Sequence, residues 1–223
     1  MNKKKATKIV VDVAMSAVLV ATMSTALVQE VPHEYLGIAA FVLITTHIVL
    51  NRAWLAATLR GRGRFGALRI VQAVTMAALV ACIIGQVASS LVLSKHALGF
   101  LPALPGASWA RRVHMACAYW SFVFAFVHAG LHIRIPRGIA TGKLWALRAA
   151  LVTISCYGVW SFIKLGLLPY LFFQVQFAFA DFSSPLSLIS VRYASVAVLL
   201  GVIGHFLRMV LAPHIERRAC PVD

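Results

Sequence analysis

The sequence predicts an all-α membrane protein, and three observations lead to that fold class. Hydrophobic residues make up 61% of the 223-residue chain, and charged residues only 12%. The apolar residues form six separate runs that are long enough to cross a bilayer as helices. Most of the 21 lysines and arginines lie between these runs, where they would flank a membrane. We therefore expect a bundle of six transmembrane helices.

The boundaries of the predicted spans follow from the apolar runs. A basic head, 1–8, precedes the first run, which could be a signal peptide because small residues, Ser24 to Ala26, lie near its end. Its length of about 20 residues favours a retained span instead. The aromatic segment after Pro169 is too short and broken to span, so it is expected to lie along the surface or to re-enter. The predicted spans are 9–28, 34–54, 67–93, 111–133, 144–168 and 186–211, and a tail, 213–223, follows them.

The positions of the basic residues predict the orientation of the chain. If the N-terminus is cytoplasmic, all but five of the 21 lysines and arginines fall on the cytoplasmic side, as the positive-inside rule requires. This distribution explains the positive net charge without any nucleic-acid partner. Both termini are then cytoplasmic, and spans 34–54 and 111–133 run in the same direction. The five exceptions are Lys95, Arg111, Arg112, Lys164 and Arg192.

Four of the eight histidines form two pairs with the same spacing. His33 and His47 are fourteen residues apart at the second span, and His114 and His128 are fourteen residues apart in the fourth. Fourteen residues come within about 40° of four full helical turns, so each pair leaves its helix on one face, about 21 Å apart along the axis. Because the two spans run in the same direction, His33 is expected at the level of His114, and His47 at the level of His128.

This arrangement is typical of two haems stacked across a bilayer. Haem iron that transfers electrons takes two axial nitrogens, one on each face of the porphyrin. A neutral imidazole supplies such a nitrogen, while its other N–H donates to a neighbouring acceptor. We expect an outer haem b held by His33 and His114 and an inner haem b held by His47 and His128, in a four-helix haem-binding core. The four cysteines lack the spacing of covalent haem attachment, of a zinc ribbon or of a thiol redox pair.

Arginines at the membrane edges are candidates for binding the haem propionates. Arg111 and Arg112 would flank the outer site, and Arg52, Arg69 and Arg134 the inner site. For each inner arginine, a role in setting topology alone is the simpler explanation. Room for the porphyrins could come from small residues on the two histidine-bearing spans, although such residues also serve plain helix packing. These small residues are Gly37, Ala39, Ala40, Ala116, Ala118, Ala125, Ala129 and Gly130.

Three further polar residues could contribute within the spans. His132 lies one turn after His128, and His205 lies near the inner level of the last span, so either could replace an inner ligand. His205 could instead bind a propionate or line a quinone pocket. Asp12, near the start of the first span, could relay protons but is expected to reach back to the membrane surface.

The histidine pattern also resembles known families. Two pairs spaced by fourteen on alternate spans resemble the cytochrome b of quinol-oxidising complexes, and more loosely the b561-type and hydrogenase-associated cytochromes. Six short segments resemble the bacterial DUF4405 group of flavinylation-associated cytochromes over about residues 5–212. The segments are His33–Gly37, Thr46–His47, Arg112–His114, Val127–His128, Phe179–Pro185 and Ile203–His205.

The resemblance implies a location and partners. It implies two haems b in a bacterial cytoplasmic membrane, and electron transfer from a membrane donor such as quinol to an extracytoplasmic flavoprotein. The sequence contains no motif for flavin attachment, so a flavin would belong to a partner.

Two other functions stay open at this point. One is a catalytic membrane oxidoreductase that reduces quinone or a metal chelate at the outer face, where the aromatic segment Phe172–Phe182 could shape a pocket. The other is a haem-free transporter or scaffold whose histidines bind protons or a divalent metal. No internal repeat is evident, which weakens the transporter alternative. The sequence favours transmembrane electron transfer by a subunit of a membrane oxidoreductase.

Overall fold

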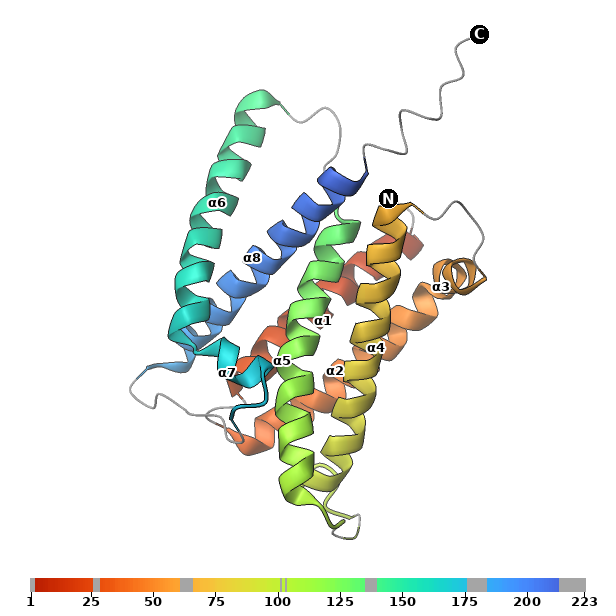
Figure 1. Cartoon of the computed structure of the whole chain (residues 1–223), viewed down its shortest axis with the longest axis vertical. Helices are drawn as coiled ribbons and strands as arrows, with labels where there is room; N and C mark the ends of the chain where they lie inside the picture. Colours follow the sequence, from red (N-terminus) through yellow and green to blue (C-terminus); the bar gives the residue numbers. More distant parts are fainter. Residues whose placement is uncertain are drawn as a thin grey trace.

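The computed structural model describes residues 3–25, 29–60, 66–100, 102, 104–134, 140–175 and 184–212 (Figure 1). Within these ranges all regular secondary structure is helical. Six helices are long and apolar enough to cross a membrane: α1 (Lys3–Thr25), α2 (Glu30–Leu50), α4 (Ala67–Leu93), α5 (Ala107–His132), α6 (Thr141–Lys164) and α8 (Leu186–Leu211). This confirms the predicted all-α bundle of six spans. The predicted tail, 213–223, lies outside the described residues.

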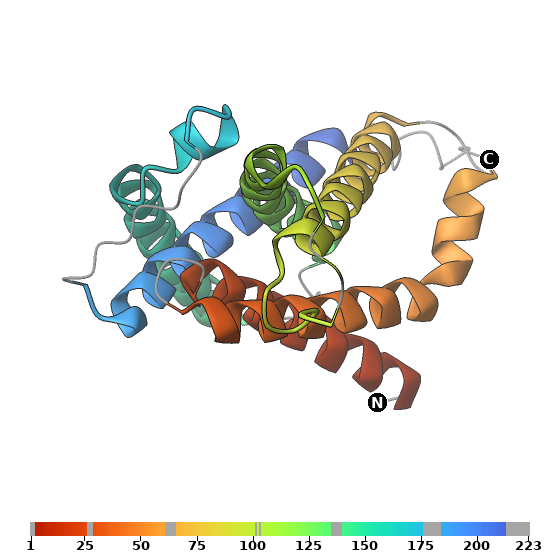
Figure 2. The same ribbon diagram turned by 90° about the horizontal axis from the view of Figure 1, so that it is seen from below.

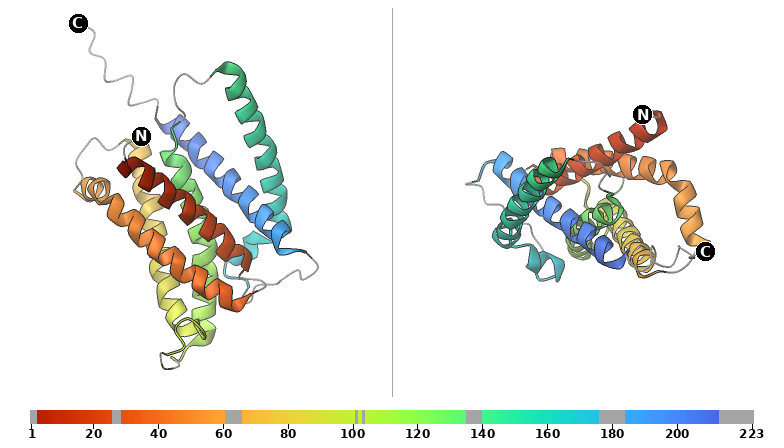
Figure 3. Two further views of the ribbon diagram at one scale, coloured as in Figure 1. Left: turned by 180° about the vertical axis from the view of Figure 1, so that it is seen from behind. Right: turned by 90° about the horizontal axis from the view of Figure 1, so that it is seen from above.

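The six long helices form two groups, α1 with α2, and α4, α5 and α6 with α8. Helix α8 joins the two groups through its contacts with α1. Helices α1 and α2 lie side by side and cross one face of the bundle (Figure 3, left). Helix α5 packs between α4 and α8, and α8 also contacts α6 and α1. Seen from below, α6 lies on the side of α8 away from α4 (Figure 2). The start of α1 and the end of α8 lie toward the same end of the bundle, whereas α2 and α5 both begin at the opposite end (Figure 1).

The apolar core lies between α5 and α8. Tyr119 and Phe122 of α5 are buried against Tyr193 of α8, whose ring lies edge-on to Phe122 at 5.8 Å between ring centres. The two backbones approach closely because glycines face each other there. A Cβ at Gly130 would lie 2.1 Å from the carbonyl oxygen of Gly201. Small residues therefore set the distance between these two helices.

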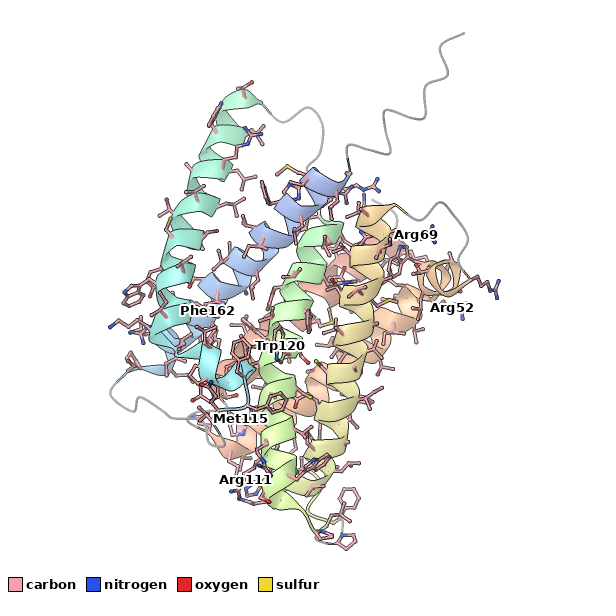
Figure 4. All side chains as sticks on the ribbon, viewed as in Figure 1. Arg52, Arg69, Arg111, Met115, Trp120 and Phe162 are labelled. Atoms are coloured by element: carbon pink, nitrogen blue, oxygen red, sulfur yellow. The ribbon has the colours of Figure 1, made fainter. Side chains whose placement is uncertain are left out.

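The segment after α6 folds back onto the bundle. The short helix α7 (Leu167–Leu171) follows Gly166, whose φ of 59° is a left-handed conformation that glycine adopts readily. Trp120 of α5 donates its indole N–H to the Leu171 carbonyl at 2.9 Å, and Tyr119 stacks on Tyr170 at 4.4 Å between ring centres (Figure 4). The start of the aromatic segment thus packs against α5, while residues 176–183 lie outside the described residues.

Helix α2 begins and ends about four residues earlier than predicted. His33 is therefore in the first turn of the helix rather than in front of it. The helix ends at Leu50 because the Asn51 side chain donates to the His47 carbonyl at 2.9 Å, and the Lys8 ammonium in turn donates to the Asn51 carbonyl oxygen at 2.8 Å. A short helix, α3 (Arg52–Leu59), follows Asn51 and includes the last three residues of the predicted span 34–54.

A single carboxylate holds the connection that follows α4. Glu34 accepts hydrogen bonds from the Ser94 hydroxyl at 2.7 Å and from the backbone N–H groups of Lys95, His96 and Ala97 at 3.0, 3.0 and 2.7 Å. These contacts fix the end of α4 to the first turn of α2, one residue after His33. Glu34 is thus a structural link between the two helices that approach His114.

We expect Glu34→Gln to loosen this connection locally. Hydrogen bonds to a charged group contribute about 1.5–3 kcal/mol each, so losing the charge should speed hydrogen exchange at the amides of 95–97 about tenfold or more. Hydrogen–deuterium exchange with mass spectrometry in detergent measures this. Glu30→Gln is the matched control, because Glu30 pairs with the exposed Lys95 ammonium and not with these amides. Equal exchange in both variants would contradict the proposed link.

Candidate functional site

Helix α5 has two different faces. One carries the buried aromatic residues that pack on α8. At about 100° per residue, His114, Ala118, Ala125, His128 and His132 share the other face. On this second face His114 contacts Ser89 of α4 and lies beside His33 of α2, while Ala118 packs against the apolar core. The histidines of this face are not part of that core.

The structure brings His33 and His114 together. Their ring centres are 6.1 Å apart and their planes are inclined at 72°. His33 lies in the first turn of α2, and His114 lies in the second turn of α5. Both helices begin at the same end of the bundle, so the two rings meet at one level.

Each of these rings uses its Nδ1 atom for a neighbouring oxygen. The Nδ1 of His33 donates to the Thr22 carbonyl of α1 at 3.0 Å. The Nδ1 of His114 lies 3.2 Å from the Ser89 hydroxyl oxygen of α4, and this hydroxyl already donates to the Gly85 carbonyl at 2.7 Å. The Ser90 hydroxyl oxygen also lies 3.4 Å from this Nδ1 atom. With Nδ1 as the donor, the Nε2 lone pair of each ring is available to a metal.

Three histidines meet at the other level. The rings of His128 and His132 lie 4.6 Å apart between centres, and His47 lies within electrostatic reach of both. Trp54 of α3 covers His132 edge-on at 5.3 Å. The Nδ1 atom of His128 is buried and has no hydrogen-bond partner among the described residues. The structure thus places His128 and His132 together beside His47, so both are candidate ligands at this level.

His47 is bound by Asp12, an acid that the sequence analysis expected to reach back to the membrane surface. Its Nδ1 lies 2.6 Å from a carboxylate oxygen of Asp12 on α1. Asp12 is half exposed, and it pairs with His47 instead of only reaching the membrane surface. His47 is therefore also an Nδ1–H donor, and its Nε2 lies 3.5 Å from the Asn51 side-chain nitrogen. The signal that could have revealed this pair is that Asp12 is the one acid inside an otherwise apolar predicted span.

Open space borders the histidine face of α2. Among the described helices of the bundle, α2 packs extensively only on α1, and none of its residues is fully buried. Gly37 lies within about 40° of His33 around the helix, and no described heavy atom comes within 4 Å of the place where a Cβ would sit. By contrast, Ala116 and Gly130 of α5 are buried, and Gly130 packs against α8. Those two residues serve helix packing, and Ala118 packs against the apolar core, so Gly37 and Ala125 remain as the small residues on the histidine side.

The candidate arginines lie at both ends of the bundle. Arg111 lies at the end of α5 near His114, whereas Arg52 and Arg69 lie at the opposite end (Figure 4). Arg112 and Arg52 are exposed. Arg134 lies within electrostatic reach of His132. Arg208 of α8 also lies within electrostatic reach of His132 and donates to the Leu131 carbonyl at 3.3 Å. The sequence analysis did not select this arginine.

His205 binds the end of α5. Its Nδ1 donates to the Ile133 carbonyl at 3.2 Å. This contact ties α8 to α5 at the end of α5 where His132 lies. His205 therefore has a structural partner, and its Nε2 is left for a ligand at the membrane edge.

No protein-family model matches the chain, and neither the curated proteins nor the solved structures contain a match. The fold defines the class of protein as a multi-pass helical membrane protein in a lipid bilayer. The resemblance to the DUF4405 group stays an expectation drawn from the sequence.

Proposed function

We propose that this protein transfers electrons across a membrane and binds two b-type haems without covalent links. His33 and His114 hold the outer haem, and His47 and His128 hold the inner one. The observation that carries the proposal is the outer pair, two imidazoles on like-directed helices whose ring centres are 6.1 Å apart and whose Nδ1 atoms each contact an oxygen.

The distance within the outer pair fits one shared metal ion. A metal–nitrogen bond to imidazole is about 2 Å long and the ring centre lies about 1 Å beyond the nitrogen, so rings that bind one ion from opposite sides have centres about 6 Å apart. The measured separation of 6.1 Å matches this value. Rotation of a ring about the metal–nitrogen bond leaves the distance unchanged, so the angle of 72° between the rings is compatible with it.

The neighbours of the rings favour the same assignment. Histidine ligands of metals donate their second N–H to a carbonyl, hydroxyl or carboxylate, which fixes the tautomer and the ring orientation. His33, His114 and His47 each have such an acceptor: a Thr22 carbonyl, a Ser89 hydroxyl and an Asp12 carboxylate. In each of these three contacts the same ring nitrogen, Nδ1, meets the oxygen.

Bound haems would supply one-electron chemistry at two depths of the membrane. The histidines do the rest of the work that we propose for the chain. The paired imidazoles would hold the haem metal, leave no position open to oxygen and keep the geometry of the metal nearly constant between redox states. Arg111 and Arg112 at one end, and Arg52 and Arg134 at the other, would neutralise the propionates, and His205, whose Nδ1 already donates to the Ile133 carbonyl, would face a quinone.

The proposed electron donor is a membrane quinol, and the proposed acceptor is an extracytoplasmic flavoprotein. An apolar groove of about 570 Å³ lies between α1 and α8 and includes Val13, Val20, Phe126 and Val191. Such a surface suits the hydrocarbon chain of a lipid-soluble quinone. We place the protein in a bacterial cytoplasmic membrane with both termini in the cytoplasm, because the basic residues then fall mainly inside.

Transmembrane electron transfer can be measured directly. Purified protein is reconstituted into liposomes that contain ferricyanide, and dithionite is added outside. We expect rapid reduction of the trapped ferricyanide by the wild type. Both His114→Ala and His47→Ala should show only the rate of protein-free liposomes, because each variant removes a ligand of one of the two haems. A wild-type rate equal to that of empty liposomes would contradict the proposed function.

Gly37→Leu tests the open space beside His33. Because nothing described lies within 4 Å of the Gly37 Cβ position, a leucine should be accepted by the helix but should fill the volume required by the outer haem. We expect outer-haem occupancy to fall at least severalfold with unchanged helical content, measured by haem absorbance and circular dichroism. Gly142→Leu is the matched control, since Gly142 of α6 also meets open space. Full haem occupancy in Gly37→Leu would show that the haem does not use this space.

A further inference from the structure

The proposed ligand histidines differ in the charge of the group that their Nδ1 atoms contact. His33 donates to a neutral backbone carbonyl, and His114 donates to a neutral hydroxyl. His47 donates to the Asp12 carboxylate at 2.6 Å, which is the short distance typical of a charge-assisted hydrogen bond. Within the described residues, Asp12 is the single acid outside the first two turns of α2. The Nδ1 partners at the two levels therefore differ in charge, and the Glu34 carboxylate acts on His33 through space without accepting from its ring.

The pair is held in place by a network at the same helix ends. Lys8, one turn before Asp12 on α1, donates to Asn51 at 2.8 Å, and Asn51 donates to the His47 carbonyl at 2.9 Å. This network fixes the backbone of His47, while Asp12 fixes its ring. Because the ring is only partly exposed, the carboxylate acts on it through limited water.

A carboxylate in this position changes the metal as well as the ring. It draws the Nδ1 proton toward itself and makes Nε2 a stronger electron donor, which stabilises the oxidised iron over the reduced iron. A backbone carbonyl or a hydroxyl does this more weakly, because neither carries a full negative charge.

We propose that Asp12 is a positioning residue that fixes His47 and selectively lowers the reduction potential of the inner haem. This inference rests on the proposed function, because it requires a haem at His47. It adds that the two haems are tuned separately, with the carboxylate acting on the inner one alone. Lower potential at the inner haem favours electron flow toward the outer haem.

The test is a redox titration of the purified protein, followed by haem absorbance, after the haem content of the wild type has been measured. Asp12→Asn keeps the shape and an acceptor oxygen but removes the charge. We expect it to raise the midpoint of the inner haem by about 59 mV, equivalent to a tenfold change in the reduced-to-oxidised ratio, and to leave the outer midpoint unchanged. Repeating the titration in a His114→Ala background identifies the inner haem.

The controls separate charge from structure. Glu30→Gln removes an acidic charge near the outer level and should leave the inner midpoint unchanged, whereas Asp12→Glu should retain the wild-type inner midpoint. Two bound haems with an unchanged inner midpoint in Asp12→Asn would overturn the inference. Loss of the inner haem in Asp12→Asn with its retention in Asp12→Glu would support a requirement for the charge. Loss of the inner haem in both variants would mean that Asp12 serves only as a helix contact, and would overturn the inference. Absence of haem from the wild type would instead reject the proposed function.

Discussion

Replacing His114 by alanine is expected to remove one of two haems per chain and to leave the other in place. The substitution deletes one of the two rings that face each other at 6.1 Å, and His33 alone offers a single axial nitrogen. The inner histidines belong to a separate cluster on the same two helices, about 21 Å away along the axis, so the inner haem should remain partly or fully bound. The measurement is the haem-to-protein ratio, determined as the pyridine haemochrome.

His96→Ala is the control for this prediction. His96 lies in the connection after α4, and its backbone N–H, rather than its ring, binds Glu34. Its replacement should leave the haem ratio at the wild-type value. If His114→Ala also kept two haems, then His33 and His114 would not be ligands, and another pair would have to be sought.

Replacing Gly204 by alanine is expected to destabilise the bundle strongly. The new Cβ would lie 2.2 Å from the Val127 carbonyl oxygen and 3.1 Å from the Gly130 Cα, and these backbone atoms cannot turn aside as a side chain can. Helices α5 and α8 would have to separate, at a cost near the upper end of the usual overpacking range, about 3 kcal/mol. Thermal unfolding in detergent should show a clearly lower Tm.

Gly142→Ala provides the matched substitution. It introduces the same methyl group at a helical glycine that has no neighbour within 4 Å, so its Tm should equal or slightly exceed that of the wild type. Equal Tm values for the Gly204→Ala and Gly142→Ala variants would mean that α5 and α8 are not held at the separation described here.

The number and order of the spans could be predicted from the sequence because bilayer thickness demands long apolar runs. Two of the predicted spans, 67–93 and 186–211, coincide with α4 and α8. The others differ at their ends, because polar residues such as Glu30 and Asn51 extend or stop a helix at positions that hydropathy does not register. The helix α3 was missed for the same reason.

The approach of the paired histidines was also predictable. Helical periodicity fixed the face of each pair, and the distribution of basic residues fixed the common direction of the two spans. The position of Asp12 in an apolar span marked it as a candidate for a polar contact, but its partner His47 was not predictable, since that depends on which face of α1 packs against α2. Ser89 and Thr22 were missed because a serine or a backbone carbonyl in a span gives no sequence signal. Gly130 was assigned to haem space but packs against α8, which neither spacing nor composition could distinguish.

The central claim is that four imidazoles at two depths bind two haems, and one measurement tests it most directly. A reduced-minus-oxidised visible spectrum of the purified wild-type protein, with a pyridine haemochrome count per chain, reports the type and number of haems together. We predict the spectrum of haem b and a ratio of two per chain. A protein that is folded and helical but contains no haem after expression with adequate haem supply would contradict the account.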